Sequence, residues 1–312
     1  MIHENDEFDF ADFCLYTYVI VDDTLKRLTK TGRAHATGPA PECSDSELCT
    51  LLLIGESKGW DVETELLSNM QAYRDMFPHL PTQSRFNRRR RQLTDLLNDI
   101  RRAMLHAMEI AQDRQCIVDS LPVPIMHFHL VPGALSGYRG SEWMVNGATY
   151  GKAVSKKLTY YGYKLHLLIT GSGLILDFEL TSANVCDLQA GRELLSGHRN
   201  LDVVGDKAYI SQAHACELAA TNNIRLLTVP RRNQKVQLPP AVATLLNGFR
   251  QLIETVNNQL TAQFNIETNH AHSFQGLCAR LVAKLTAHTM SIYINRLLGR
   301  TDWLNIKRLA FN

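Results

Sequence analysis

The chain has 312 residues, 45% of them hydrophobic, and a formal net charge of +2. That length can bury one large core and a smaller helical domain, and the lack of any uncharged apolar run of about 18 residues excludes a membrane-spanning helix. The seven cysteines form no C-x-x-C pair, which argues against a structural zinc site. The first residues are acidic and carry no secretion signal, so we expect a cytoplasmic protein.

The first third of the chain shows helical patterns throughout. Residues 44–47 (SDSE) place short polar and acidic side chains before the apolar run 48–54. This pattern is typical of a helix start, because a side-chain oxygen can accept an orphan backbone N–H. Two prolines near residue 80 interrupt the pattern, and a further helix is predicted from about residue 82.

This further helix carries a run of arginines followed by apolar residues at helical spacing. The arginines are Arg88, Arg89, Arg90 and Arg91, and the apolar residues are Leu93, Leu96, Leu97, Ile100, Met104 and Leu105. Four successive residues cover nearly a whole helical turn, so some of the arginines must face solvent. Two interpretations stay open: a solvated charged face, or phosphate contact by a helix-turn-helix-like DNA reader.

The pattern changes to mixed strands and helices after about residue 112. In chain order we predict a strand at 115–119, an irregular stretch at 121–130, a long loop to about 157, a hairpin of strands at 158–170 and 174–180, a helix at 184–195, a strand at 201–205, a helix at 211–222, a strand at 224–229, and helices at 240–264 and 273–298. Residues 171–173 (GSG) supply the turn of the hairpin.

This order of elements predicts the fold class. Three adjacent strands followed by alternating helices and strands imply a mixed sheet covered by helices. The order is that of the ribonuclease-H-like fold, so we expect an α/β protein of this kind with an N-terminal all-helical domain. The predicted segments are a helical DNA-binding domain over 1–112, a catalytic domain over 113–268, and a C-terminal helical segment over 269–312 that packs on the catalytic domain.

Three acidic residues occupy informative places in this order. Asp119 ends the first strand, Asp206 follows the fourth, and Glu254 lies on the late helix. If the first and fourth strands are neighbours, their terminal acids meet at one edge of the sheet, where a helix can add a third carboxylate. Three carboxylates in one site repel one another unless cations are present, and Mg²⁺ prefers oxygen ligands. We therefore predict that Asp119, Asp206 and Glu254 are both the catalytic residues and the metal ligands.

The predicted metal is Mg²⁺, two ions per site, with Mn²⁺ able to substitute. Two ions about 3.5–4 Å apart can hold the attacking and leaving oxygens of a phosphoryl transfer. Each acid also has a plainer interpretation: Asp119 and Asp206 could cap turns, and Glu254 could be a solvated helix residue. Asp187 and Glu267 are alternatives for the third ligand.

Basic side chains near these acids are candidates for DNA contact. Besides the arginine run they are Lys164, His166, Lys207, Arg231, Arg232 and Arg250. His166 lies within an apolar strand, where a hydrogen-bonded core histidine is the more common role. The lysines and arginines could instead keep loops soluble.

Several short motifs resemble those of single-gene bacterial insertion-sequence transposases with a DDE domain. They are residues 86–89 (FNRR), 118–122 (VDSLP), 161–166 (YGYKLH), 205–209 (GDKAY), 253–255 (IET), 263–267 (QFNIE) and 296–298 (RLL). The resemblance runs from residue 44 to the end of the chain and implies catalytic roles for Asp119, Asp206 and Glu254. A related group carries Tyr, Arg, Glu and Lys around the helix acid; here Arg250 and Glu254 match, whereas Asn247 and Thr261 replace the other two.

The expected function is therefore a DNA transposase. It would cleave the ends of its element and join the 3′-hydroxyls to target DNA, with double-stranded DNA as partner, a homodimer as the active form and no membrane association. Such a protein would be nucleoid-associated. The alternatives are a ribonuclease-H-like nuclease or resolvase that does not join ends, a catalytically inactive DNA-binding repressor, and a metal-dependent phosphatase on small substrates, which leaves the arginine helix unexplained.

Overall fold

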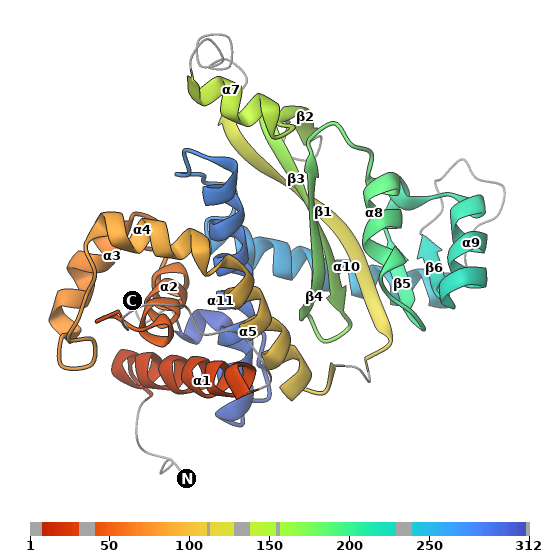
Figure 1. The fold of residues 1–312 in the computed structure, drawn as a ribbon. Helices are drawn as coiled ribbons and strands as arrows, with labels where there is room; N and C mark the ends of the chain where they lie inside the picture. The colour runs from red at the N-terminus through yellow and green to blue at the C-terminus, as the bar shows by residue number, and fades with distance from the viewer. Residues whose placement is uncertain are drawn as a thin grey trace. The chain divides into compact units, whose positions relative to one another are not determined.

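The computed structural model describes residues 8–30, 41–110, 113–127, 138–153, 157–228 and 239–309. The chain forms two compact units (Figure 1). The first comprises Met1–Met108, Ala262–Asn265 and Gln275–Asn312, and the second comprises Glu109–Thr261 and Ile266–Phe274. No helix in the described ranges is long and apolar enough to cross a membrane.

The first unit is helical, as predicted. Its elements are α1 (Phe10–Lys30), α2 (Asp45–Lys58), α3 (Glu63–Asn69), η1 (Met70–Tyr73), α4 (Gln83–Gln92), α5 (Thr94–Ala107), α11 (Phe274–Leu297) and η5 (Ile306–Leu309). Ser44 and Glu47 form a reciprocal capping box at the start of α2, which confirms the helix start inferred there. The arginine run and the apolar residues behind it belong to two helices, α4 and α5, because the backbone leaves helical geometry at Leu93.

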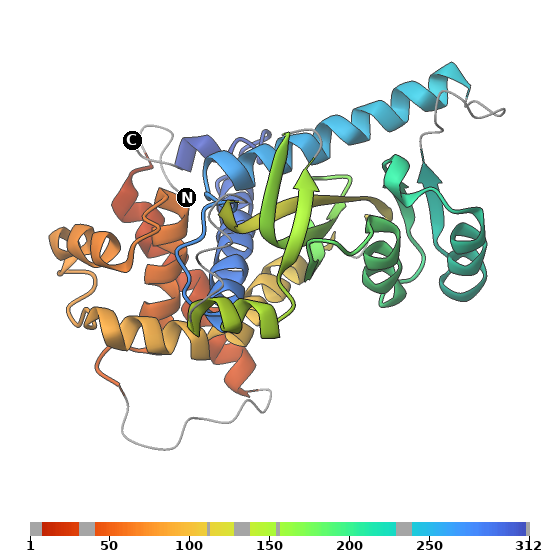
Figure 2. The ribbon, with the colours of Figure 1, turned by 90° about the horizontal axis from the view of Figure 1, so that it is seen from above.

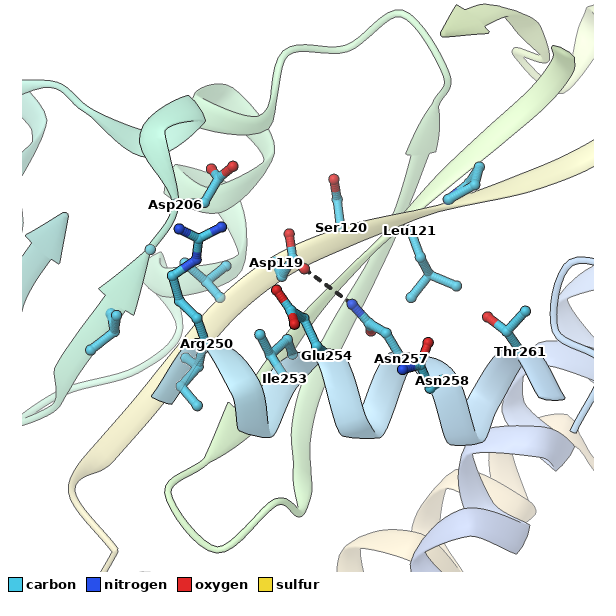
Figure 3. Close-up of a pocket in the computed structure, with 15 residues that line it drawn as sticks. Asp119, Ser120, Leu121, Asp206, Arg250, Ile253, Glu254, Asn257, Asn258 and Thr261 are labelled. Carbon is cyan, nitrogen blue, oxygen red and sulfur yellow. Dashed lines mark hydrogen bonds between the residues drawn. The ribbon is translucent and has the colours of Figure 1, made fainter. Parts of the chain in front are cut away.

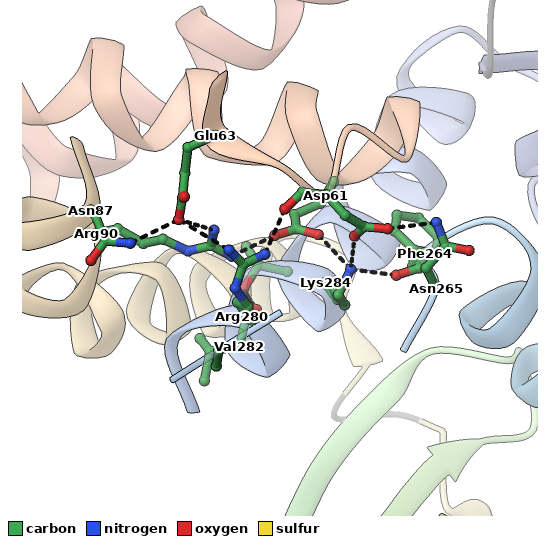
Figure 4. A network of polar contacts seen from close by, with 12 residues as sticks. Asp61, Glu63, Asn87, Arg90, Phe264, Asn265, Arg280, Val282 and Lys284 are labelled. Atoms are coloured by element: carbon green, nitrogen blue, oxygen red, sulfur yellow. Dashed lines mark hydrogen bonds and ion pairs between the residues drawn. The ribbon is translucent and has the colours of Figure 1, made fainter. Parts of the chain in front are cut away.

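Buried charges link the helices of this unit (Figure 4). Lys284 on α11 donates to Glu56 at 2.8 Å, to Asp61 at 2.6 Å and to the carbonyl of Phe264 at 2.6 Å. Arg280, also on α11, binds Glu63 at 3.0 Å. The structure thus groups α11 with the N-terminal helices, a different partition from the three segments expected from the sequence.

The second unit is a six-stranded mixed sheet flanked by helices. Its elements are β1 (Gln115–His127), α7 (Tyr138–Val145), β2 (Thr149–Ala153), β3 (Leu158–Thr170), β4 (Ile175–Ser182), α8 (Asp187–Ser196), β5 (Asp202–Gly205), η4 (Lys207–Tyr209), α9 (Gln212–Asn222), β6 (Arg225–Thr228) and α10 (Pro240–Ala262). The strand order is β2-β3-β1-β5-β6, with β4 also paired to β3. β1, β3 and β4 are antiparallel neighbours, whereas β5 and β6 run parallel to β1.

Helices cover both faces of this sheet. Apolar residues of α8 and α9, including Leu194 and Leu218, pack on Cys116 and Val118 of β1 and on Val203 of β5. Figure 2 shows α10 on the opposite face of the sheet. The predicted α/β class, the hairpin at 171–173 and the helices and strands from residue 184 onward are confirmed.

Two local expectations were wrong. The stretch predicted to be irregular after Asp119 continues as strand β1 to His127, through Pro122 and Pro124. Within the described residues β5 pairs with β1 only as far as Val118, so the prolines lie where β1 needs hydrogen bonds on one side only. The predicted loop before residue 157 contains α7 and β2, and the buried Trp143 anchors α7.

Candidate active site

A cleft of ≈ 470 Å³ lies between the middle of β1, the carboxyl end of β5 and the helix α10 (Figure 3). Asp119, Asp206 and Glu254 all line it. The two rival acids, Asp187 and Glu267, are not among its lining residues. The structure therefore brings together, around one cleft, the three acids that the sequence singles out.

Strand register explains why two of the acids meet. β1 and β5 are parallel, and Val118 is paired with Gly205. Asp119 is the next residue of β1, which continues to His127, and Asp206 directly follows the last residue of β5, so the two acids stand side by side where β1 runs on beyond the end of β5. The side chain of Asp206 accepts a hydrogen bond from the backbone N–H of Ala208 at 2.7 Å, which fixes the turn into η4.

The third acid comes from the amphipathic helix α10. Its apolar face is buried through Ile253, Val256 and Leu260. Its polar positions that line the cleft are Arg250, Glu254, Asn257, Asn258 and Thr261. Spacings of three and four residues place these side chains on one face of the helix. In Figure 3 the side chain of Arg250 extends toward Asp206.

Asn257 is a site residue that the sequence interpretation missed. Its Nδ2 donates to Oδ2 of Asp119 at 3.0 Å, and its own Oδ1 is buried with no hydrogen-bond partner in the described structure. Its position one helical turn after Glu254 was the available signal, because residues three apart share a face of a helix. An amide held in this way fixes the orientation of the Asp119 carboxylate.

The environment of Asp119 disfavours its charged form. Burial raises its pKa to about 6, and the negative charges of Asp206 and Asp187 add to this, against the hydrogen bonds from Ser120 and Asn257. No ion pair in the described part of the chain includes Asp119, Asp206 or Glu254. Nor do any three His, Cys, Asp or Glu side chains among the described residues stand close enough together to hold a metal ion between them. Within the described residues the three carboxylates therefore form no ion pair, although Arg250 lines the same cleft.

Lys164 and His166 are not among the residues that line the cleft. Lys164 donates to Asp187 and to the carbonyl of Val185, both at 2.7 Å. His166 has no exposed surface and shares a hydrogen bond of 2.9 Å with Thr181, and burial lowers its pKa to about 4. This arrangement favours a core role for His166 over a phosphate contact.

The other candidate DNA contacts fall into three groups. Lys207 is exposed and Arg250 lines the cleft, so both can be reached by a ligand. Arg231 and Arg232 lie outside the described residues. The arginine run on α4 divides: Arg90 is buried, whereas Arg88 is exposed.

Replacing Asp119 by asparagine is expected to raise the free energy of unfolding at pH 8, without divalent cations, by up to about 3 kcal/mol. The pKa of Asp119 is about 6 in the folded chain against an ordinary 3.8, so the folded state loses stability as pH rises between these values. The gain should vanish below about pH 4, where the carboxyl is protonated in both states. Urea denaturation of both proteins between pH 4 and pH 8 measures this difference in the free energy of unfolding.

Asp202→Asn on β5 is the matched control. The hydrogen bond from Arg225 lowers the pKa of Asp202, so its removal should bring no gain in stability. The assigned environment of Asp119 would be contradicted if Asp119→Asn were no more stable than wild type at pH 8. It would also be contradicted if the variant gained as much stability at pH 4 as at pH 8.

Fold and cleft together define an α/β protein with three acidic side chains around one cleft beside a mixed sheet. A family model described as the transposase DDE domain matches residues 116–274, just over half of the chain. The chain belongs to this family, and it is a transposase, a protein of DNA transposition and recombination. The match spans all three cleft acids. Comparisons with curated proteins and with solved structures gave no match.

Proposed function

We propose that this transposase cleaves the ends of its element and joins the freed 3′-hydroxyls to target DNA, with Asp119, Asp206 and Glu254 as its catalytic carboxylates. One observation carries the proposal: the Val118–Gly205 register sets Asp119 beside Asp206, and Glu254 faces the same cleft. Three carboxylates at one cleft of a DDE domain suit phosphoryl transfer on DNA.

The proposed fold of the catalytic unit is ribonuclease-H-like. The order β4-β3-β1-β5-β6 supports it, with three antiparallel strands on one side and two parallel strands on the other. β2 is an addition that pairs with the first half of β3. We also propose that the catalytic domain covers 113–268 and that the helical region 1–112 binds DNA.

The chemistry of the cleft fits divalent cations. DDE domains generally use them, and the three acids that line the cleft offer oxygen ligands. Asp119, Asp206 and Glu254 would hold the ions, with Mg²⁺ as the proposed metal, Mn²⁺ as its substitute and two ions per site. When bound, such ions stabilise the attacking and leaving oxygens of a phosphodiester.

The surrounding residues would position the DNA and the carboxylates. Asn257 holds one oxygen of Asp119, and the Asp119 side chain lines the cleft. Arg250 on the same helix can bind a phosphate oxygen beside the acids, and the exposed Lys207 can bind the neighbouring backbone. Asp187 is already engaged by Lys164 and Ser120, so it supports the edge of the sheet.

Two successive displacements make up the proposed reaction. Water attacks the phosphodiester at the element end, the bond to the 3′-oxygen breaks, and a 3′-hydroxyl and a 5′-phosphate result. That hydroxyl then attacks a target phosphodiester, forms the new strand junction and releases a target 3′-hydroxyl. Joining two ends in this way favours a homodimer as the active form.

A strand-transfer assay with precleaved element ends tests the function. Products in which the end is covalently joined to a target plasmid support a transposase that joins. Metal-dependent cleavage without joined products would instead favour a nuclease or resolvase, and DNA binding without either reaction would favour a repressor.

Replacing Asn257 by leucine is expected to slow cleavage roughly 10- to 100-fold, the usual effect of losing a group that orients a ligand. The apolar side chain keeps the packing volume but releases the Asp119 carboxylate. Mn²⁺ affinity, measured by electron paramagnetic resonance in the absence of DNA, should fall as well. A purely structural role would lower stability without changing this affinity.

Asn258→Leu is the matched control, because Asn258 lines the same cleft on the same helix. It should leave Mn²⁺ affinity within twofold of wild type. Equal losses of Mn²⁺ affinity in both variants would exclude a specific positioning role for Asn257.

A further inference from the structure

The arginine run on α4 contains residues of two kinds. Arg90 is buried and binds Glu56 at 2.7 Å, with Glu63 at 3.6 Å. Arg89 binds Asp45 at 2.5 Å and the carbonyl of Cys43. These two guanidiniums fasten α4 to α2, to α3 and to the segment before α2. They are engaged within the protein and are not free for a ligand.

The opposite face of α4 is different. Ser84, Arg88 and Arg91 follow one another at spacings of four and three, so they form a stripe along the helix. Arg85 lies beside this stripe, and both Arg85 and Arg88 are exposed with no ion-pair partner in the described ranges. No acidic residue occurs on α4, so all charged side chains on this face are basic.

A shallow groove of ≈ 360 Å³ runs along the same face, lined by Gln83, Ser84, Asn87 and Arg91. Each of these side chains can donate or accept hydrogen bonds. Asn87 is held in place because its Nδ2 donates to Glu63 at 2.9 Å, which leaves its oxygen as an acceptor. Figure 4 shows Asn87 at the edge of the buried ion network, so the same contacts that fasten α4 also orient a groove residue.

We propose that this face of α4, defined by Gln83, Ser84, Arg85, Asn87, Arg88 and Arg91, is the surface that reads the terminal DNA of the element. The proposal rests on the proposed function, which requires recognition of specific ends. An α-helix fits the major groove of double-stranded DNA, arginine binds phosphates and guanine, and Asn and Gln bind adenine. Arg89 and Arg90 supply a rigid support, and Arg85, Arg88 and Arg91 supply the contacts to DNA.

Binding of the full-length chain to duplex DNA, followed by fluorescence anisotropy without divalent cations, tests this surface. The probes are a duplex taken from the element's own end and a shuffled duplex of the same composition. We expect Arg88→Ala and Arg91→Ala each to weaken end binding roughly tenfold and to reduce the salt slope by about one. Gln83→Ala should narrow the preference for the end over the shuffled duplex.

Arg27→Ala is the matched control, since Arg27 is an exposed arginine on α1 of the same unit. It should bind both duplexes within twofold of wild type. Binding within twofold by both α4 variants would overturn the proposal, as would an equal loss in Arg27→Ala. Because the assay contains no divalent cation and measures no cleavage, loss of end binding in the α4 variants bears on this surface alone, whereas loss of cleavage with retained end binding bears on the catalytic proposal.

Discussion

Replacing Glu254 by glutamine is expected to reduce cleavage of element-end DNA by roughly 10³-fold or more. The variant keeps the size and hydrogen-bonding capacity of the side chain but removes one of the three carboxylates that line the cleft. Loss of several kcal/mol of electrostatic stabilisation at the reacting phosphate corresponds to a factor of this size. Single-turnover cleavage of a labelled duplex with Mg²⁺ measures the effect.

Glu267→Gln is the sharpest comparison, because Glu267 was the rival for the same role. Glu267 is not part of the cleft, so its replacement should leave cleavage within a few-fold of wild type. Near-normal cleavage by Glu254→Gln together with inactivity of Glu267→Gln would transfer the role to Glu267 and require a different arrangement around Asp119.

Replacing Lys284 by methionine is expected to lower the free energy of unfolding by about 3–5 kcal/mol, the range seen when one partner of a buried ion pair is removed. The ammonium of Lys284 is buried and bound by Glu56, Asp61 and a carbonyl. Methionine fills similar space but leaves these acceptors without their donor. Chemical denaturation at neutral pH gives the value.

The dependence of this loss on pH checks its cause. Burial works to raise the pKa of Glu56, but the charges of Lys284 and Arg90 outweigh it and hold the pKa below its ordinary 4.5. The stabilisation from Glu56 is therefore present above that value and is lost as pH falls. The deficit of Lys284→Met should shrink in acid for the same reason.

Two further variants distinguish the loss of this ion network from the general effect of replacing a lysine on stability. Lys307→Met, at an exposed lysine, should change stability by less than about 0.5 kcal/mol. Glu56→Gln combined with Lys284→Met should cost less than the sum of the two single changes. Strict additivity would contradict direct coupling of Glu56 and Lys284.

Local patterns in the sequence predicted much of this structure. The neighbouring positions of Asp119 and Asp206 follow from short apolar runs that each lead into an acid. The parallel pairing of β1 with β5 does bring these residues together, although β1 does not end at Asp119 as predicted. The amphipathic spacing of the apolar residues in α10 could likewise be recognised from the sequence. These features depend on residues that are close together in the chain, which is why the sequence alone could predict them.

Features that depend on contacts between residues far apart in the chain could not be predicted in this way. The continuation of β1 through Pro122 and Pro124 depends on which edge of the strand is paired. The division of the arginine run depends on Glu56 and Asp45, which come from another part of the chain. The role of Asn257 depends on a contact with Asp119, 138 residues away in the chain.

The most direct test of the account is a joining assay with precleaved element ends, a target plasmid and Mg²⁺, run on wild type and on Asp119→Asn, Asp206→Asn and Glu254→Gln. DNA binding is measured on the same samples. The account predicts that wild type joins the ends and that each variant binds DNA but forms no joined product. Joining by all three variants at the wild-type rate would contradict it.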